Sequence, residues 1–478
     1  MRELGEYSDL IGAMRESISQ IDAVFSKADS PVVVYVGRNV AFRKGQRFIN
    51  ALISGTSDAH WMTLSEYPLL SQQDVTDTFG IKDVMIPIRM PMSGCYDKNM
   101  SVRITPEIED ICRNVRYVAE AVANVKWHFY NMGENYPELI CWYLYSIHKR
   151  IIKVLKESGQ PFTFVMWGEG PPSHHILKNI CLEESIPVRF LEFGVVAGTI
   201  SMESFGQIGR SEFAVDHERY FRLRTDREDL KRARGIIDIS RNRRLNRKDQ
   251  MDTSEIMATL LTILKPKRPI VVFYMMDDFE SCIIPWTEKN RAERSPMFGS
   301  SREAADYLVG LSEKYGWNLI LKPHPLTKCV ERKKKYDPRY AIWLEDMDIN
   351  DLIDLSDVSV TLYSQVSFDS LIRGKPVVMM GYNQLRGQGC TYECYDRSEL
   401  EGTILRAIKK GYTRKQRRNF EKALAKLCYH SNIFDSLEAV NDIPWGRPID
   451  PCVESLKDAL EESARKSISG TTATGTDK

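Results

Sequence analysis

Short runs of β-branched and aromatic residues alternate with longer amphipathic stretches along most of the chain. Continuous apolar runs bounded by glycine or proline are typical of strands in parallel sheets that helices cover on both faces. Seven such runs predict strands, centred near residues 34, 164, 190, 271, 320, 360 and 378. Because helical patterns separate them, we expect an α/β fold with at least two parallel sheets.

The region 221–250 interrupts this alternation. It carries eleven Lys or Arg against five Asp or Glu and has no strand pattern. We therefore predict a first α/β domain over 1–235, a basic linker and helix over 236–268, a second α/β domain over 269–445, and a C-terminal helix and tail over 446–478. Residues 467–478 are rich in Ser, Thr and Gly, a composition that is expected to stay disordered.

Composition narrows the functional classes. The 478 residues include 66 Lys and Arg against 65 Asp and Glu, so the chain lacks the cation surplus that nucleic-acid binders use to displace phosphate counterions. The longest apolar stretch, 139–155, contains four basic residues and falls short of the roughly 20 apolar residues of a membrane-spanning helix. The N-terminus, 1–17, resembles an acidic amphipathic helix rather than a secretion signal, so a cytoplasmic protein is expected. Ten scattered cysteines without a CxxC pair predict buried, reduced thiols.

Ligands of open α/β sheets bind beyond the carboxyl ends of the strands, so the residues that follow each predicted strand are candidates for chemistry. The strand near 320 runs into Lys322 and His324, which are held in a stiff turn by two prolines. A fixed positive charge beside a histidine donor suits a phosphate or a sugar carboxylate. A histidine that merely caps a neighbouring element is the alternative.

The strand near 360 is followed by hydroxyl and amide side chains at the predicted start of a helix. Ser364, Gln365 and Ser367 stand there, and backbone N–H groups at a helix start favour an anion such as a pyrophosphate. Asp369, in the first turn of that helix, is expected either to cap it or to accept a ribose or sugar hydroxyl. Gly389, in a glycine-rich loop after the next strand, would let the backbone approach a ligand closely, although glycines also simply make turns.

Carboxylates follow three other predicted strands. Asp277 and Asp278 follow the strand near 271, where they could bind sugar hydroxyls or a divalent metal, or form a solvated acidic loop. Glu169 and Glu192 end two strands that are expected to be neighbours, and such a pair can supply a base or a nucleophile for sugar transfer. Helix or turn capping is the alternative for both glutamates. We expect no metal at His174 and the adjacent histidine, because neighbouring helical side chains point about 100° apart.

No GxSxG, HExxH, Walker A or GxGxxG motif is present, so the sequence does not support a serine hydrolase, a zincin metalloprotease, a P-loop NTPase or a dinucleotide-dependent oxidoreductase.

Taken together, the segments KPHP, TLYSQVSFDSLIRGKPVVMMG and GQGCTYE resemble the C-terminal domain of bacterial capsule polysaccharide synthesis glycosyltransferases, a group that includes the Kdo transferases. VMWGEGPPSHHILKNI and FLEFGVVAGTISMESFGQIGRS resemble their N-terminal partner domain. The resemblance covers about residues 160–410. It implies a GT-B fold, in which two Rossmann-like domains face one another and the second binds the nucleotide sugar.

The resemblance also implies roles for individual residues. His324, Ser364, Gln365 and Ser367 match donor phosphate and nucleotide positions, Asp369 matches an acidic residue on the donor, and Glu192 matches the acidic residue of a Glu-x-Gly turn. Retaining Kdo members carry a catalytic aspartate just before that glycine, where this chain has Phe193, which leaves Glu192 or Glu169 as the expected base. The complete set of candidates comprises the catalytic pair Glu192 and Glu169, the donor-binding residues Lys322, His324, Ser364, Gln365, Ser367, Asp369, Asp277, Asp278 and Gly389, and the acceptor-side residues His174, Gln207 and Ser211.

The predicted function is transfer of a sugar from a nucleotide donor to a hydroxyl of a surface polysaccharide or lipid-linked glycan, with neither metal nor cofactor. The alternatives are a CDP-alditol-dependent glycerol- or ribitol-phosphate transferase, a sugar-nucleotide 2-epimerase, and a non-catalytic assembly protein. The basic run 405–422 carries eight cations against one glutamate, which indicates either peripheral contact with the inner face of the membrane or a solvated helical face.

Overall fold

The computed structural model describes residues 29–37, 39–65, 82–85, 101–129, 132–245, 253–325, 336–438 and 445–472, with residues 11, 12, 14, 15 and 18. Most of the predicted N-terminal helix, residues 246–252 of the predicted linker and residues 473–478 of the predicted tail lie outside these ranges. The chain forms two compact units. The first comprises Met1–Glu192, Ser436–Glu438 and Pro448–Lys478, and the second comprises Phe193–Asp435 and Ala439–Arg447.

The first unit is built on five parallel strands, which pair in the order β3-β2-β1-β4-β5. Their bounds are β1 Val32–Val36, β2 His60–Ser65, β3 Lys82–Met85, β4 Phe162–Trp167 and β5 Val188–Phe193. In register, Val34 of β1 lies opposite Met62 on one side and Phe164 on the other. Every residue of β1 is buried, as expected for a strand with helices on both faces.

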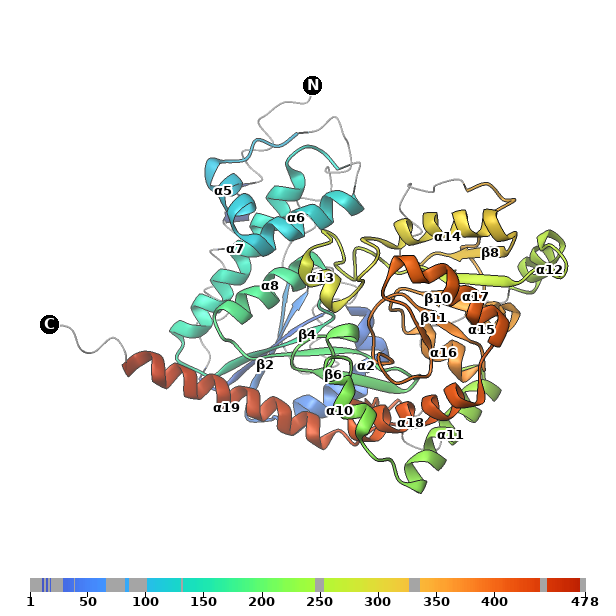
Figure 1. Ribbon diagram of the computed structural model, residues 1–478. Helices are drawn as coiled ribbons and strands as arrows, with labels where there is room; N and C mark the ends of the chain where they lie inside the picture. The colour runs from blue at the N-terminus through green and yellow to red at the C-terminus, as the bar shows by residue number, and fades with distance from the viewer. Residues whose placement is uncertain are drawn as a thin grey trace. The chain divides into compact units, whose positions relative to one another are not determined.

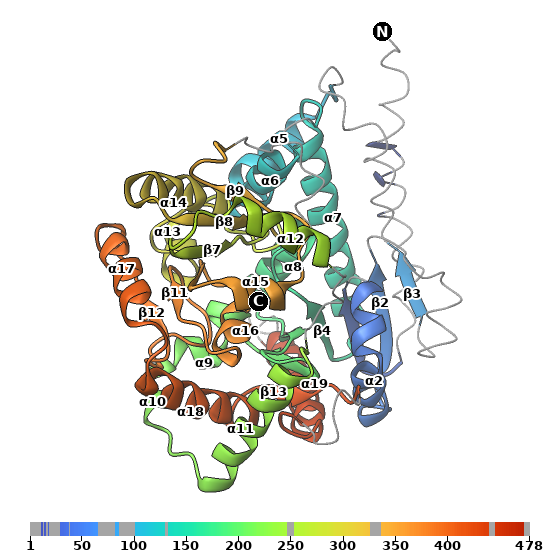
Figure 2. The ribbon, with the colours of Figure 1, turned by 90° about the vertical axis from the view of Figure 1, so that its right-hand side faces the viewer.

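The described helices of this unit, apart from its N-terminal segment, are α2 Asn39–Gly55, α5 Pro106–Asn114, α6 Arg116–His128, α7 Tyr136–Glu157, α8 Pro172–Glu183 and α19 Asp450–Thr472. Figure 2 shows α19 beside α2. The absence of a side chain at Gly55 permits this approach, because a Cβ there would lie 2.6 Å from Val453. Arg189 of β5 also donates to the hydroxyl and carbonyl oxygens of Ser455, at 2.9 and 2.8 Å. The helix thus extends to residue 472, inside the segment 467–478 that was expected to stay disordered.

The second unit contains a six-stranded parallel sheet in the order β12-β11-β10-β7-β8-β9. Figure 1 labels three of its strands, β8, β10 and β11. The strands are β7 Ile270–Tyr274, β8 Asn318–Lys322, β9 Ile342–Trp343, β10 Val358–Thr361, β11 Val377–Met379 and β12 Tyr392–Glu393. The predicted α/β class with parallel sheets in both halves is therefore confirmed.

Alternate residues of β7 face two different hydrophobic clusters. Val271 and Phe273 belong to a cluster with Leu308 of α14 (Ser301–Tyr315), and that cluster includes Ile404 of α17 (Leu400–Lys410). Val272 and Tyr274 belong to another, which includes residues of α12 (Ser254–Ile263) and α15 (Ile349–Leu355). Helices therefore cover both faces of the sheet, which leaves its strand ends and their loops as the exposed polar part.

A smaller part of the second unit pairs β6 (Thr199–Glu203) with β13 (Ile433–Asp435) in antiparallel fashion. Around it lie the short helices α9 (Glu212–Val215) and α10 (His217–Arg222), with the longer α11 (Arg227–Asn242) and α18 (Arg414–His430). The remaining helices are α13 (Glu288–Glu293) and α16 (Val366–Ile372). Much of the region that interrupted the strand alternation is α11, which packs on α18 inside this unit.

The sequence predicts buried cysteines and no membrane-spanning helix. Within the described ranges each cysteine is buried, as predicted. The apolar stretch 139–155 lies in α7, and the described residues include no helix that is long and apolar enough to cross a bilayer.

Candidate functional site

The loops after β7 and β8 bring Asp277 and His324 together. Nδ1 of His324 lies 3.8 Å from Oδ2 of Asp277, and the aspartate side chain is only 5% exposed, against 26% for the histidine. The other carboxylate oxygen of Asp277 accepts the backbone N–H groups of Phe279 and Glu280, at 3.0 and 3.1 Å. These two bonds orient the aspartate, so that its second oxygen faces the partly exposed imidazole.

Asp278 is half-buried and binds the start of α14 instead. Both of its carboxylate oxygens accept the backbone N–H of Ser301, at 2.9 and 3.0 Å, which ties the loop after β7 to the first turn of α14. Burial, with the charge of Asp277 as a lesser cause, raises the pKa of Asp278 to about 7. This places Asp278 in a capping position, whereas its predicted contact with the donor stays a prediction.

Lys322, the last residue of β8, is also largely buried. Its ammonium group donates to the backbone carbonyl of Glu345 at 2.6 Å. The charge is therefore fixed in place near the end of β8. Its predicted contact with the donor phosphate stays a prediction.

The residues after β10 form a compact turn around two serines. Ser364 donates its backbone N–H to the hydroxyl of Thr361 at 3.2 Å, and its own hydroxyl accepts the N–H of Val366 at 3.3 Å. The fully buried Ser367 donates to the carbonyl of Ser364 at 2.9 Å and accepts from Asn383 at 3.0 Å. Sequence reasoning missed Asn383, because nothing in the loop after β11 singles out one amide.

The helix that follows, α16, is only seven residues long, and Asp369 lies half-buried in its first turn. A short helix contributes little dipole at its start, so the hydroxyl groups and the turn itself carry the anion-binding prediction here.

The glycine-rich loop after β11 is held in shape by a carboxylate that sequence reasoning also missed. The N–H of Gly387 lies 3.0 and 3.1 Å from the two oxygens of Glu393, and the hydroxyl of Tyr395 donates to the same carboxylate at 2.8 Å. Gly389 has a φ of +66°, and a Cβ there would lie 2.9 Å from the side chain of Asn419. The position therefore requires glycine for a structural reason, whatever its role towards a ligand.

In the first unit, Glu169 and Glu192 follow or end the adjacent strands β4 and β5, as predicted. Glu169 forms a buried ion pair with Lys178 of α8 at 2.9 Å, with both side chains less than 5% exposed. The lysine nine residues further along the predicted helix was the available sequence signal for this pair. His174, also buried, donates from Nδ1 to the carbonyl of Gly168 at 3.2 Å.

Glu192 is the first residue of a turn in which close contacts restrict the side chains that fit. The carbonyl of the next residue, Phe193, accepts a bond from the side-chain amide of Gln365 at 3.1 Å. A Cβ at Gly194 would lie 2.0 Å from the hydroxyl of Thr199, so only glycine fits this third position. The Glu-x-Gly turn and the serine-rich turn after β10 are thus joined by a hydrogen bond. This contact brings a predicted donor-binding residue next to the residue that follows Glu192.

The predicted acceptor-side residues Gln207 and Ser211 lie in the segment that follows β6, and both are buried. Ser211 caps α9 by accepting the N–H of Ala214 at 3.3 Å, and it donates to the carbonyl of Ile208 at 2.7 Å. Glu203, at the end of β6, supports this segment by accepting from the N–H of Glu212 at 3.1 Å. Burial raises the pKa of Glu203 to about 8.

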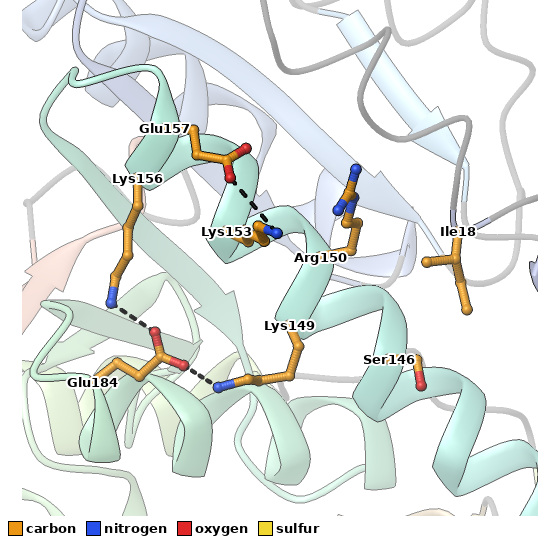
Figure 3. A pocket seen from close by; sticks show the side chains of 8 residues that line it. All are labelled: Ile18, Ser146, Lys149, Arg150, Lys153, Lys156, Glu157 and Glu184. Carbon is orange, nitrogen blue, oxygen red and sulfur yellow. Dashed lines mark hydrogen bonds and ion pairs between the residues drawn. The ribbon is translucent and has the colours of Figure 1, made fainter. Parts of the chain in front are cut away.

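A surface hollow also lies along α7 in the first unit (Figure 3). Lys149 and Lys156 both bind Glu184 there, and Lys153 lies 3.7 Å from Glu157. Lys149 and Lys156 share one carboxylate, so these three lysines face only two glutamates, and the hollow, which Arg150 also lines, keeps a surplus of positive charge. In the described ranges, no group of three or more His, Cys, Asp or Glu is placed to hold a metal ion.

Residues 298–403 match the family model of capsule polysaccharide biosynthesis proteins. The matched region contains Lys322, His324, the serine-rich turn with Asp369, and Gly389. The relation to capsule synthesis proteins that the sequence motifs indicated is therefore confirmed over this part of the second unit. No curated protein sequence matches the chain.

Three solved structures illustrate the distant likenesses of the chain. The β-Kdo 2,7 transferase KpsC of Thermosulfurimonas dismutans is 17% identical, with 66% of this chain and 89% of that chain covered and a TM-score of 0.39. The UDP-GlcNAc 2-epimerase of Neisseria meningitidis is 11% identical, with 90% and 100% covered and a TM-score of 0.31. A kitacinnamycin glycosyltransferase is 10% identical, with 91% and 100% covered and a TM-score of 0.33.

The raised pKa of Asp278 makes the free energy of unfolding depend on pH. Because its pKa is raised in the folded protein above the unfolded value of 3.8, the folded state binds the proton more tightly, and stability falls as pH rises from about 4 through 7. We expect Asp278→Asn to remove a decrease of roughly 1–4 kcal/mol in the free energy of unfolding between pH 5 and pH 8, measured by urea denaturation. Asp238→Asn, at an exposed position of α11, is the control. An unchanged pH slope in Asp278→Asn would contradict this assignment.

Proposed function

We propose that this protein is a metal-independent glycosyltransferase of capsule or other surface polysaccharide synthesis. It transfers a sugar from a nucleotide donor to a hydroxyl of a polysaccharide or lipid-linked glycan in the cytoplasm. The observation that supports this most directly is the hydrogen bond from Gln365 to the carbonyl of Phe193, because it joins the Glu-x-Gly turn to the serine-rich strand end. The match of residues 298–403 to capsule biosynthesis proteins supports the substrate class.

In this proposal the strand ends of the second unit bind the diphosphate of the donor. His324, oriented by Asp277, donates a hydrogen bond to the phosphate, and the fixed charge of Lys322 favours the dianion. The bond between the sugar's anomeric carbon and the phosphate oxygen breaks, and the nucleotide leaves with that electron pair. Stabilising this leaving group lowers the barrier to transfer.

Glu192 is the proposed base. It accepts the proton of the acceptor hydroxyl while the acceptor oxygen bonds to the anomeric carbon. Glu169 is the weaker candidate, because its carboxylate is buried and already paired with Lys178. We assign Glu169 instead to holding the start of α8, where the predicted acceptor-side residue His174 lies.

Donor binding can be tested in a thermal-shift panel of CMP, CDP, UDP, GDP, their sugars and CDP-alditols, run with EDTA present. One nucleotide-sugar family is expected to raise the melting temperature, by an amount equivalent to about 2.7 kcal/mol at a hundred times its Kd. His324→Ala should weaken that shift because a phosphate donor is lost, whereas His60→Ala, exposed at the start of β2, should not.

No shift with any of these ligands, in protein with a native melting transition, would contradict the proposed function. A shift with CDP-alditols alone would favour the glycerol- or ribitol-phosphate transferase.

The two glutamates should differ in what their substitution damages. Glu192→Gln is expected to lower the transfer rate on the order of 10²–10⁴-fold at unchanged stability, because a general base is lost. Glu169→Gln should lower the free energy of unfolding by about 3–5 kcal/mol, because the buried Lys178 loses its carboxylate. Transfer of labelled sugar and urea denaturation measure the two effects.

Glu157→Gln serves as the control for both glutamates, since its side chain is 60% exposed on α7. If Glu192→Gln transferred sugar at the native rate, Glu192 would not be the base.

A further inference from the structure

Large apolar side chains are exposed on one stretch of the second unit. Phe205, Val215, Phe221 and Leu223 are 38 to 70% exposed, and all four lie within residues 205–223. Elsewhere in the described ranges, the exposed large apolar residues are Leu182 in the first unit and two residues of α12. Isolated exposed apolar residues are ordinary, but a concentration of them in one segment indicates a surface that contacts something else.

Arginines are interleaved with these apolar residues. The sequence from Arg219 to Arg224 reads RYFRLR. Arg222 lies between Phe221 and Leu223, Arg219 precedes Phe221 by two residues, and Arg224 follows Leu223 directly. The side chains of Arg219 and Arg222 are 58% and 78% exposed, and they form surface ion pairs with Glu212 at 2.6 Å and Glu218 at 3.0 Å. Arg224 is exposed as well. Tyr220 points inward and is buried, so it anchors the helix while its neighbours face solvent.

A row of basic residues on α18 continues this surface. Figures 1 and 2 show α10 beside α18. The ammonium group of Lys426 donates to the carbonyl of Phe221 at 2.9 Å and lies 5.8 Å from the centre of its ring. Arg414, Arg418 and Lys422 precede Lys426 at intervals of four residues and are exposed, whereas Lys426 itself is buried beneath Phe221. The exposed basic row on α18 therefore consists of Arg414, Arg418 and Lys422. The basic run seen in the sequence thus leads to the exposed phenylalanine.

We propose that α10 and the adjoining side of α18 bind the surface of an anionic phospholipid bilayer. Phe221 and Leu223 would enter the interface between headgroups and acyl chains, while the arginines and the row on α18 bind lipid phosphates. Charge complementarity selects this occupant, because the segment after Tyr220 and the exposed side of α18 combine large apolar side chains with exposed cations, namely Arg224, Arg414, Arg418 and Lys422. The proposal rests on the proposed function for its purpose, since a lipid-linked acceptor is presented at such a surface. Gln207 and Ser211, the predicted acceptor-side residues, belong to the same stretch.

The test is co-sedimentation of the full chain with vesicles of phosphatidylcholine, with and without phosphatidylglycerol. The native protein should bind the phosphatidylglycerol vesicles preferentially, and added salt should weaken this binding. The double variant F221S/L223S should bind about tenfold more weakly, since two inserted side chains are lost. R222Q/R224Q should lose the preference for phosphatidylglycerol.

The matched control is L261S/I263S, which removes two exposed apolar side chains from α12 and should bind as the native protein does. Binding of F221S/L223S equal to that of the native protein, or native binding without a preference for phosphatidylglycerol, would overturn the proposal. Both variants of α10 should keep the nucleotide-induced thermal shift. Loss of vesicle binding with the shift intact therefore concerns this surface alone, whereas absence of the shift in native protein concerns the proposed function.

Discussion

Parallel pairing of β10, β7 and β8 places the carboxyl ends of all three strands at one edge of the sheet. Helices cover both faces, so this edge is where polar side chains can gather without disturbing the core. Asp277 and His324 are 47 residues apart in the chain (324 − 277), yet the pairing of β7 with β8 brings them within ion-pair distance. The serine-rich turn follows the neighbouring strand on the other side. The proposed donor site depends on this arrangement.

Close backbone approaches set the second constraint on the site. Gly194 leaves room for Thr199, and the residue before it bonds to Gln365. The loop after β11 is held by Glu393 through Gly387. These contacts fix loops that carry candidate residues. Gln365 belongs to the candidate set, whereas Gly194, Thr199 and Glu393 lie outside it. Preorganised loops of this kind can stabilise a leaving group without reorganising at the moment of reaction.

Periodicity and composition were enough to predict the parallel α/β class, because long β-branched runs such as VVVYV leave few alternatives. The strands β9 and β12 were missed, since two residues carry no periodic signal. The strands β2, β3, β6 and β13 were missed as well, because none of them is a continuous β-branched run. The strand-end candidates followed from fold logic and motif resemblance. Partners distant in sequence, such as Asn383 for Ser367 and Glu393 for Gly387, could not be predicted, because hydrogen bonding between loops depends on tertiary packing rather than on local sequence. The net charge of +1 gives no sign of the basic row on α18, which only the local composition of residues 405–422 indicates.

Hydrogen exchange with and without the stabilising nucleotide can show whether the strand ends of the second unit bind a nucleotide sugar. We expect slower exchange in 275–281, 323–325, 362–367 and 380–389, where bound phosphate and sugar would restrict the loops. Exchange in α12 should be unchanged. Protection confined to other segments, such as the hollow along α7, with none at these strand ends would show that the donor binds elsewhere.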